Sequence, residues 1–255
     1  MNFLHNLIFT ILGLCVGSFV YVLIDRLPKR KNDLWSRSRC DFCRKTLRWF
    51  ELIPIVSYLL QSGRCLRCHK MLSLQYPLVE MSTGVGYLLL TLKYNNSWLI
   101  LASQLIIFSC FLVIFVADFK YTIIPDAMII VAFLASLMML FAPESININF
   151  YNRLSSAVGA GLVFLFIWSI TQGRGMGFGD VKLVFVLGFI LGFPAVAVSL
   201  YLAFLTGTVA GVILIAIGKK SVKSKIPFGP FLILGFWLTQ VWGDQVIKYW
   251  MKFII

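Results

Sequence analysis

The sequence is poor in charged residues, and poorest in acidic ones. Only 13% of the 255 residues are Asp, Glu, Lys or Arg, whereas 60% are hydrophobic and the mean hydropathy is +0.89. A soluble domain has about a quarter of its residues charged, and these keep its surface in water. The scarcity of charge therefore excludes an ordinary cytosolic enzyme, a disordered protein and a coiled coil. We expect an all-α, polytopic integral membrane protein.

In place of charge the sequence has a series of apolar runs, many of them long enough to cross a hydrocarbon core about 30 Å thick. The segment 181–217 is too long for a single span, and Pro194 favours a break that turns it into a hairpin. With this hairpin we expect about eight transmembrane helices, at residues 3–24, 77–93, 97–117, 124–142, 154–171, 181–193, 194–217 and 227–247.

The basic residues gather between alternate runs and predict the orientation. Of the 23 Lys and Arg residues, nineteen fall on one side of an eight-span topology and four on the other. The positive-inside rule then places the first side in the cytosol and both termini outside. No Lys or Arg precedes the first run, which favours a retained N-terminal helix within 1–27 over a cleaved signal peptide. We assign the net charge of +13 to orientation and to contact with anionic membrane lipids, and not to nucleic acid.

Cysteine is also scarce, but four of the six cysteines form two CxxC pairs in the one long polar segment, 28–76. Cys40 and Cys43 make the first pair, and Cys65 and Cys68 make the second. Two such pairs supply the tetrahedral thiolate shell that structural zinc prefers. Metal binding would also stabilise a cytosolic segment too small to fold on apolar burial alone. Free thiols or two disulfides are the alternatives, and the reducing cytosol disfavours disulfides.

The ten acidic residues are few enough to consider one by one. Asp118 ends an apolar run, and Asp180 begins a short one directly after glycines at 173, 175, 177 and 179, which permit a strained, closely approached backbone. Two carboxylates held close share a proton, so that one can act as general base towards water and the other as general acid. Spacing alone nevertheless favours an interfacial charge or a helix N-cap for each. Asp126, which follows a proline, is predicted to be an N-cap.

The sequence also contains an ordered set of motifs similar to those of the type IV prepilin peptidases, which are membrane aspartyl proteases with a GxGD motif. The resemblance covers essentially the whole chain, and the length is most similar to that of the competence-type peptidases of Gram-positive bacteria. The motifs are Gly-Ser-Phe at 17–19, Ile-Pro-Ile-Val-Ser-Tyr at 53–58, Tyr-Pro-Leu-Val-Glu at 76–80, Ile-Pro-Asp at 124–126 and Gly-Phe-Gly-Asp at 177–180.

The resemblance implies an aspartic endopeptidase of the bacterial cytoplasmic membrane. Asp118 and Asp180 would be its catalytic pair, and Gly177 and Gly179 would shape the turn that presents Asp180. The substrates would be type IV prepilins or pseudopilins, whose short basic leader is removed at the cytosolic face. The peptidase domain would occupy residues 97–255.

The resemblance also implies a bifunctional enzyme, which N-methylates the new N-terminal residue with S-adenosylmethionine. The zinc-binding loop 28–76, with an associated region to about residue 93, would belong to this activity. No GxGxxG turn follows a strand, and no strand is evident in the sequence. Glu80 is a candidate for binding the cofactor, although a lone carboxylate at a helix start more often serves as a charge near the helix terminus.

Two functions of other classes remain open at this point. A zinc-bearing membrane scaffold of a secretion or uptake machine would carry the same cysteine pairs and would tolerate asparagine at both aspartates. A proton-coupled transporter would use intramembrane carboxylates as proton sites. Transporters often contain internal repeats, and none is evident in the sequence. The sequence predicts no oligomeric state.

Overall fold

The computed structural model describes residues 3–27, 37–40, 42–142, 149–173, 175–218 and 227–254, and for residues 244 and 247–254 it describes the backbone alone. No strand occurs among these residues, which confirms the all-α prediction. Several predicted features lie outside the described residues. They are the start of the polar segment at 28–36 and the cytosolic basic residues Arg174, Lys219, Lys220, Lys223 and Lys225.

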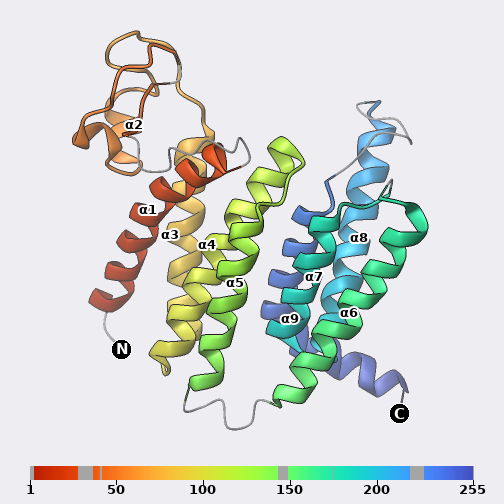
Figure 1. The fold of residues 1–255 in the computed structure, drawn as a ribbon. Coiled ribbons are helices and arrows are strands. Elements are labelled where there is room, and N and C mark those ends of the chain that lie inside the picture. The colour runs from red at the N-terminus through yellow and green to blue at the C-terminus, as the bar shows by residue number, and fades with distance from the viewer. Residues whose placement is uncertain are drawn as a thin grey trace. The chain divides into compact units, whose positions relative to one another are not determined.

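A helix coincides with each of the eight predicted apolar segments (Figure 1). Four of them, α1, α4, α6 and α8, are long and apolar enough to cross a membrane, so the remaining spans stay a prediction. The helices are α1 Phe3–Arg26, α3 Gln75–Lys93, α4 Trp98–Tyr121, α5 Asp126–Met138, α6 Phe150–Thr171, α7 Phe178–Leu191, α8 Ala195–Ala216 and α9 Gly229–Ile254. Shorter helices are η1 Trp49–Leu52, α2 Val56–Leu60 and η2 Met139–Phe141.

The chain divides into two compact units, Met1–Val113 and Ile114–Ile255. In the first unit α1 packs along α3, and the polar segment with α2 lies beyond the end of α1 (Figure 1). Gly13 and Gly17 form a stripe of small residues on the face of α1 that contacts α3. A larger residue does not fit at either position, because its Cβ would collide with Thr83 of α3. Such stripes let helices approach closely where lipid gives no hydrophobic drive for association.

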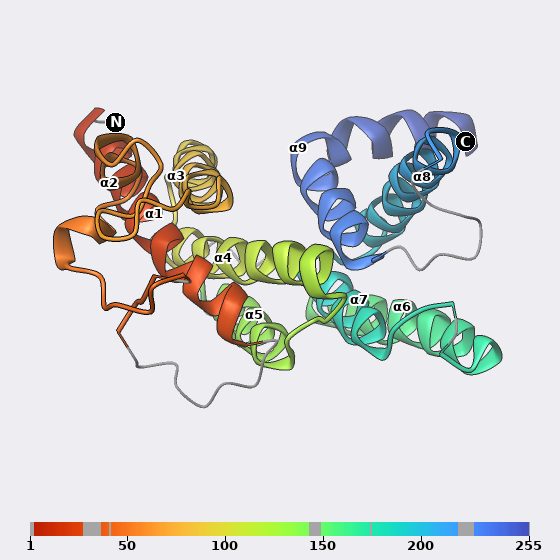
Figure 2. The same cartoon turned by 90° about the horizontal axis from the view of Figure 1, so that it is seen from above.

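In the second unit α6 pairs with α7, and α8 pairs with α9 (Figure 2). A Cβ at Gly188 of α7 would lie 2.8 Å from the Cα of Ala157, so these two helices are in backbone contact. Helix α7 also contacts α5, α8 and α9, and most of its residues are buried. Its 14 residues make it shorter than a full span, as predicted.

The predicted break between the sixth and seventh apolar segments is present. Helix α7 ends before Gly192, whose φ of +70° is readily adopted only by glycine. The side chain of Asn152 in α6 then accepts a hydrogen bond from the Phe193 N–H and donates one to its carbonyl, both at 2.9 Å. These bonds satisfy the backbone of the turn before α8 begins at Ala195.

Candidate functional site

Asp180 lies in the first turn of α7 and is only 5% exposed. The backbone N–H of Gly177, which precedes the helix, donates to its Oδ2 at 3.1 Å. Asp180 is therefore the third residue of the helix and not its N-cap, since the N-cap is Gly177. Its other oxygen, Oδ1, is buried and has no hydrogen-bond partner within the described part of the chain. Leaving a buried carboxylate oxygen without a hydrogen bond lowers the stability of the fold, unless the oxygen binds a proton, a water or a group of the substrate.

Asp118 lies near the end of α4 and is also 5% exposed. Its Oδ2 accepts a hydrogen bond of 3.0 Å from the N–H of Gly229, the first residue of α9. The first N–H groups of a helix have no partner within the helix and favour a nearby negative charge. Asp118 and Asp180 lie close enough for their charges to interact. The fold thus brings together two buried carboxylates, each bound to a backbone N–H at or beside a helix start.

Ile124, in the link between α4 and α5, lies so close to positions 179 and 229 that a Cβ at either position would crowd it. A Cβ at Gly179 would lie 3.0 Å from the Cβ of Ile124. A Cβ at Gly229 would lie 2.7 Å from the Asp118 Oδ2 and 3.2 Å from the Cδ1 of Ile124. The close approach that the sequence predicted therefore occurs at Gly179. Of the glycines that precede Asp180, Gly173 has a positive φ, of +70°, whereas Gly177 and Gly179 do not.

Asp126 does not have the role predicted for it. Pro125 is the N-cap of α5 and Asp126 the first helical residue. Its Oδ1 instead accepts a hydrogen bond of 2.8 Å from the Nζ of Lys182 in α7, forming an ion pair. The Asp126 side chain is 62% exposed, in contrast to the two buried aspartates. It is therefore a surface charge that links the starts of α5 and α7.

Gly229 was missed by the sequence reasoning, although it donates to one of the two carboxylates. The available signal was its place between Pro227 and Pro230 at the start of the last apolar run, which is typical of a helix start. That signal locates a free backbone N–H. Its pairing with Asp118, far away in the sequence, depends on the fold alone.

The four cysteines of the two CxxC pairs form one cluster in the first unit. Their Sγ atoms all lie within 4.8 Å of one another, and those of Cys40 and Cys68 are 3.9 Å apart. A tetrahedral zinc with Zn–S distances of about 2.3 Å needs S···S separations of about 3.8 Å. The thiols are free of disulfides. Their number, chemistry and spacing fit a single Zn²⁺ ion.

Each cysteine pair lies in the same kind of turn, a short structural repeat that the sequence reasoning did not recognise. In each turn the N–H of the first cysteine donates to the carbonyl of the residue five positions later. The carbonyl of the same cysteine accepts from the N–H of the residue four positions later. The bonds are Cys40 to Lys45, Arg44 to Cys40, Cys65 to Lys70 and His69 to Cys65, at 2.9–3.0 Å. Arg44 and His69 also share a positive φ, of +55° and +53°. The two turns thus place two equivalent pairs of thiols next to each other.

The two buried thiols differ in acidity. Backbone N–H groups of Cys68 and Arg67 lower the pKa of Cys65 to about 7, since they stabilise its thiolate. Burial raises the pKa of Cys40 to about 11. The Cys65 thiolate therefore forms more readily than the Cys40 thiolate, and metal binding would favour loss of the proton from both.

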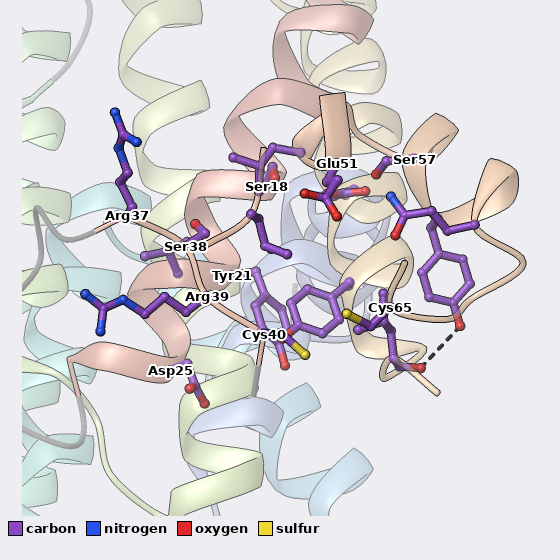
Figure 3. A pocket seen from close by; sticks show the side chains of 18 of the residues that line it. Ser18, Tyr21, Asp25, Arg37, Ser38, Arg39, Cys40, Glu51, Ser57 and Cys65 are labelled. Atoms are coloured by element: carbon purple, nitrogen blue, oxygen red, sulfur yellow. Dashed lines mark hydrogen bonds between the residues drawn. The ribbon is translucent and has the colours of Figure 1, made fainter. Parts of the chain in front are cut away.

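A pocket of about 350 Å³ also lies in the first unit, between α1, α3 and the cysteine cluster (Figure 3). Its polar wall combines acidic, basic and phenolic side chains. The lining includes Tyr21, Arg37, Arg39, Glu51, Tyr76 and Glu80, together with Cys40 and Cys65 of the cluster.

Glu80 is one of the most buried charged residues of this pocket, at 8% exposure. The sequence analysis placed Glu80 at the start of a helix. This placement is wrong, because α3 begins five residues earlier, at Gln75. The Oε2 of Glu80 accepts a hydrogen bond of 2.8 Å from the N–H of Ile55. Ile55 has a φ of +60°, which is rare for a β-branched residue and persists only where its surroundings impose it.

Comparison with known proteins follows the same division of the chain. A model of the bacterial peptidase A24 N-terminal domain matches residues 11–94, and one of the type IV leader peptidase family matches residues 105–212. A protein of Bacillus subtilis (strain 168) named prepilin leader peptidase/N-methyltransferase is 32% identical, over 95% of this chain and 96% of its own. The chain belongs to the type IV leader peptidase family.

Other members of the type IV leader peptidase family are nearly as similar. Proteins of the same name from Stutzerimonas stutzeri and Pseudomonas aeruginosa are 30% and 29% identical, each over 95% of this chain and 92% of its own. No solved structure matches the chain. The two buried aspartates fall within the leader peptidase match, and the cysteine cluster and the pocket fall within the N-terminal match. Family membership confirms the resemblance that the motifs indicated.

Proposed function

We propose that this membrane protein removes the short basic leader of type IV prepilins or pseudopilins and then N-methylates the new N-terminal residue. The observation that carries the proposal is the pair of interacting, buried carboxylates at Asp118 and Asp180. Relatives that match almost the whole chain are named for both activities. The predicted charge asymmetry supports cleavage at the cytosolic face of the bacterial cytoplasmic membrane, with both termini outside.

The two aspartates hydrolyse the peptide bond with a water and without a covalent intermediate. One oxygen of each carboxylate is held by a backbone N–H, from Gly177 or Gly229, so both groups keep a fixed orientation. The buried Oδ1 of Asp180 is available to a proton or to the attacking water. One carboxylate takes a proton from this water as it attacks the scissile carbonyl, and the other supplies a proton to the leaving amine. Gly177 and Gly179 form the start of α7 that presents Asp180.

The four cysteines hold one structural Zn²⁺ ion, and S-adenosylmethionine supplies the methyl group. A Zn²⁺ ion held by the four thiolates would join the two turns of the polar segment and would stabilise a segment too small to fold on apolar burial alone. The membrane contributes anionic lipids, which attract the basic residues predicted on the cytosolic side.

The test is cleavage of a purified prepilin by the detergent-solubilised protein and three isosteric variants. Wild type should shorten the substrate, and Asp118→Asn and Asp180→Asn should lose activity by at least about a thousandfold, because each removes an acid–base group. Asp126→Asn is the matched control. It should stay within about fivefold of wild type, since an exposed ion pair contributes little.

Each result has a definite meaning once circular dichroism shows that the variants fold. Full activity in Asp118→Asn or Asp180→Asn would assign that residue a structural role. A wild type that cleaves no prepilin, but carries protons across liposomes, would instead support a transporter. A wild type that does neither would support a scaffold.

A further inference from the structure

We propose that the pocket between α1, α3 and the cysteine cluster is the S-adenosylmethionine site. The inference rests on the proposed methyltransferase activity and assigns it a place in the molecule. Glu51 and Glu80 supply buried negative charge to the cationic parts of the ligand, and Tyr21 and Tyr76 supply an aromatic surface.

The strongest observation is a pair of buried carboxylates without a cation. Glu51 is 9% exposed and Glu80 is 8% exposed. Each accepts a backbone hydrogen bond, from Arg48 at 2.6 Å and from Ile55 at 2.8 Å respectively. Within the described part of the chain, neither takes part in an ion pair. Because an ionised carboxylate removed from water is costly unless a charge balances it, this pocket is suited to a cationic ligand.

The charge pattern of the pocket also matches a ligand that carries both signs. S-adenosylmethionine has a sulfonium and an ammonium group, a carboxylate, a ribose diol and a flat adenine ring. Figure 3 shows Glu51 and Ser57 on one side of the pocket, and on the other side Arg37 and Arg39 together with the single acidic residue Asp25. The acidic side fits the two cations or the diol, which carboxylates bind in other nucleotide sites. The basic side fits the ligand's carboxylate.

Size and aromatic content agree with this assignment. The volume of about 350 Å³ falls in the range of small-molecule sites, roughly 300–1,000 Å³. The rings of Tyr21 and Tyr76 lie 4.0 Å apart and line the pocket, where a purine ring can pack against them. Adenine recognition therefore needs no Rossmann turn, which this helical chain lacks.

Two structural features hold the acidic side in place. The bond from Ile55 to Glu80 keeps the carboxylate oriented and maintains the positive φ of Ile55. Cys40 and Cys65 lie in the wall of the pocket and also belong to the cysteine cluster. A metal in that cluster would therefore fix one wall of the cofactor site.

The proposal predicts a loss of S-adenosylmethionine binding when the pocket loses its negative charge. Glu80→Gln keeps an acceptor for the Ile55 N–H and removes only the charge. In full-length protein in detergent, isothermal titration calorimetry should show an increase in the Kd for S-adenosylmethionine of about 10- to 100-fold. The Kd for S-adenosylhomocysteine should rise less, because its sulfur is neutral. Cleavage of prepilin should remain within about threefold of wild type.

A second variant keeps the proposal testable if Glu80→Gln does not fold. Ser57→Phe places a ring in the pocket and removes no hydrogen bond that the structure shows for Glu80. It should abolish binding of both ligands while cleavage persists. Asp118→Asn is the matched control in the other unit. It should lose cleavage and bind S-adenosylmethionine as wild type does.

The outcomes separate this inference from the proposed function. If wild type cleaves and methylates, but Glu80→Gln and Ser57→Phe bind S-adenosylmethionine unchanged, the assignment of the pocket is wrong and the function stands. If the two variants instead raise the KM for prepilin and leave the Kd for S-adenosylmethionine unchanged, the pocket binds the basic leader. If wild type neither cleaves nor methylates, the proposed function itself fails.

Discussion

At the scale of the residue, two opposing effects act on each catalytic candidate. Burial of Asp118 and Asp180 disfavours their charge, whereas the backbone N–H groups of Gly229 and Gly177 favour it. The donors also restrict where each carboxylate points. A two-aspartate mechanism depends on this restriction, since water must lie within reach of both groups. We therefore propose that Gly229 is a positioning residue, which acts through Asp118.

Substituting Gly229 by alanine should therefore impair cleavage through geometry. The new Cβ would lie 2.7 Å from the Asp118 Oδ2, so the carboxylate or the start of α9 must move. We expect kcat for prepilin cleavage to fall by about a hundredfold, the effect of a displacement near 1 Å. Gly159→Ala is the control, because a Cβ there meets nothing within 4 Å, and its activity should not change. A Gly229→Ala variant with normal kcat would show that the contact does not position Asp118.

At the scale of the element, the two cysteine turns and α7 differ in what stabilises them. Helix α7 is held by backbone contact with α6, through Gly188, and by several further helices. The backbone hydrogen bonds that the structure describes for the two cysteine turns stay within each turn, and the contact described between the turns is that of the Cys40 and Cys68 Sγ atoms. A metal bound by all four thiols would join the two turns.

The cysteine turns should accordingly bind one zinc per chain, measured by inductively coupled plasma mass spectrometry. Combined Cys40→Ser and Cys65→Ser changes should remove the metal and lower the melting temperature of the first unit. Cys15→Ser, which alters an exposed cysteine outside the cluster, should retain both. Full zinc occupancy in the double variant would contradict a four-cysteine site.

The affinity of the cysteine cluster for zinc should also depend on pH, because the thiols must lose their protons to bind the metal. Each thiol loses its proton on binding, so protons compete with the metal and affinity falls as the pH falls. Cys65, with a pKa of about 7, is largely protonated below neutrality, and Cys40, with a pKa of about 11, is protonated throughout this range. Titration with a chelating dye from pH 8 to pH 5 should show progressive release. Release that increases towards pH 8 would contradict thiolate ligation.

At the scale of the whole molecule, the two proposed activities fall in different compact units. The aspartates lie in the second unit, and the pocket and cysteine cluster lie in the first. The order of the reactions follows from their chemistry, because the N-terminal amine to be methylated exists only after cleavage. The two proposals together predict that the substrate's new end is cleaved at the second unit and methylated at the first.

This order predicts a specific rescue. Asp118→Asn should leave an intact prepilin unmethylated, since no new amine forms. The same variant should methylate a pilin that already lacks its leader, at a rate close to that of wild type. Mass spectrometry of the N-terminal peptide measures both. Methylation of the intact prepilin, or none of the shortened one, would show that the two activities are not separate.

The sequence by itself determined the membrane class, the positions of the eight helices and which four cysteines form a cluster. Hydropathy, helix breaks at Pro and Gly, and CxxC spacing are local properties, so a chain read in order reveals them. A carboxylate beside an apolar run is conspicuous, which drew attention to Asp118, Asp180, Asp126 and Glu80, and the resemblance to the family then selected Asp118 and Asp180 as the predicted pair. The sequence did not reveal which backbone N–H group donates a hydrogen bond to each carboxylate.

Only the tertiary structure decided the contacts between distant residues. It placed Gly229 on Asp118, paired Asp126 with Lys182, and buried Glu80 against Ile55. In each case one group is an ordinary glycine, charge or backbone N–H whose partner lies in another helix or loop. Such pairings follow from how the helices pack, and no local pattern of residue types encodes them.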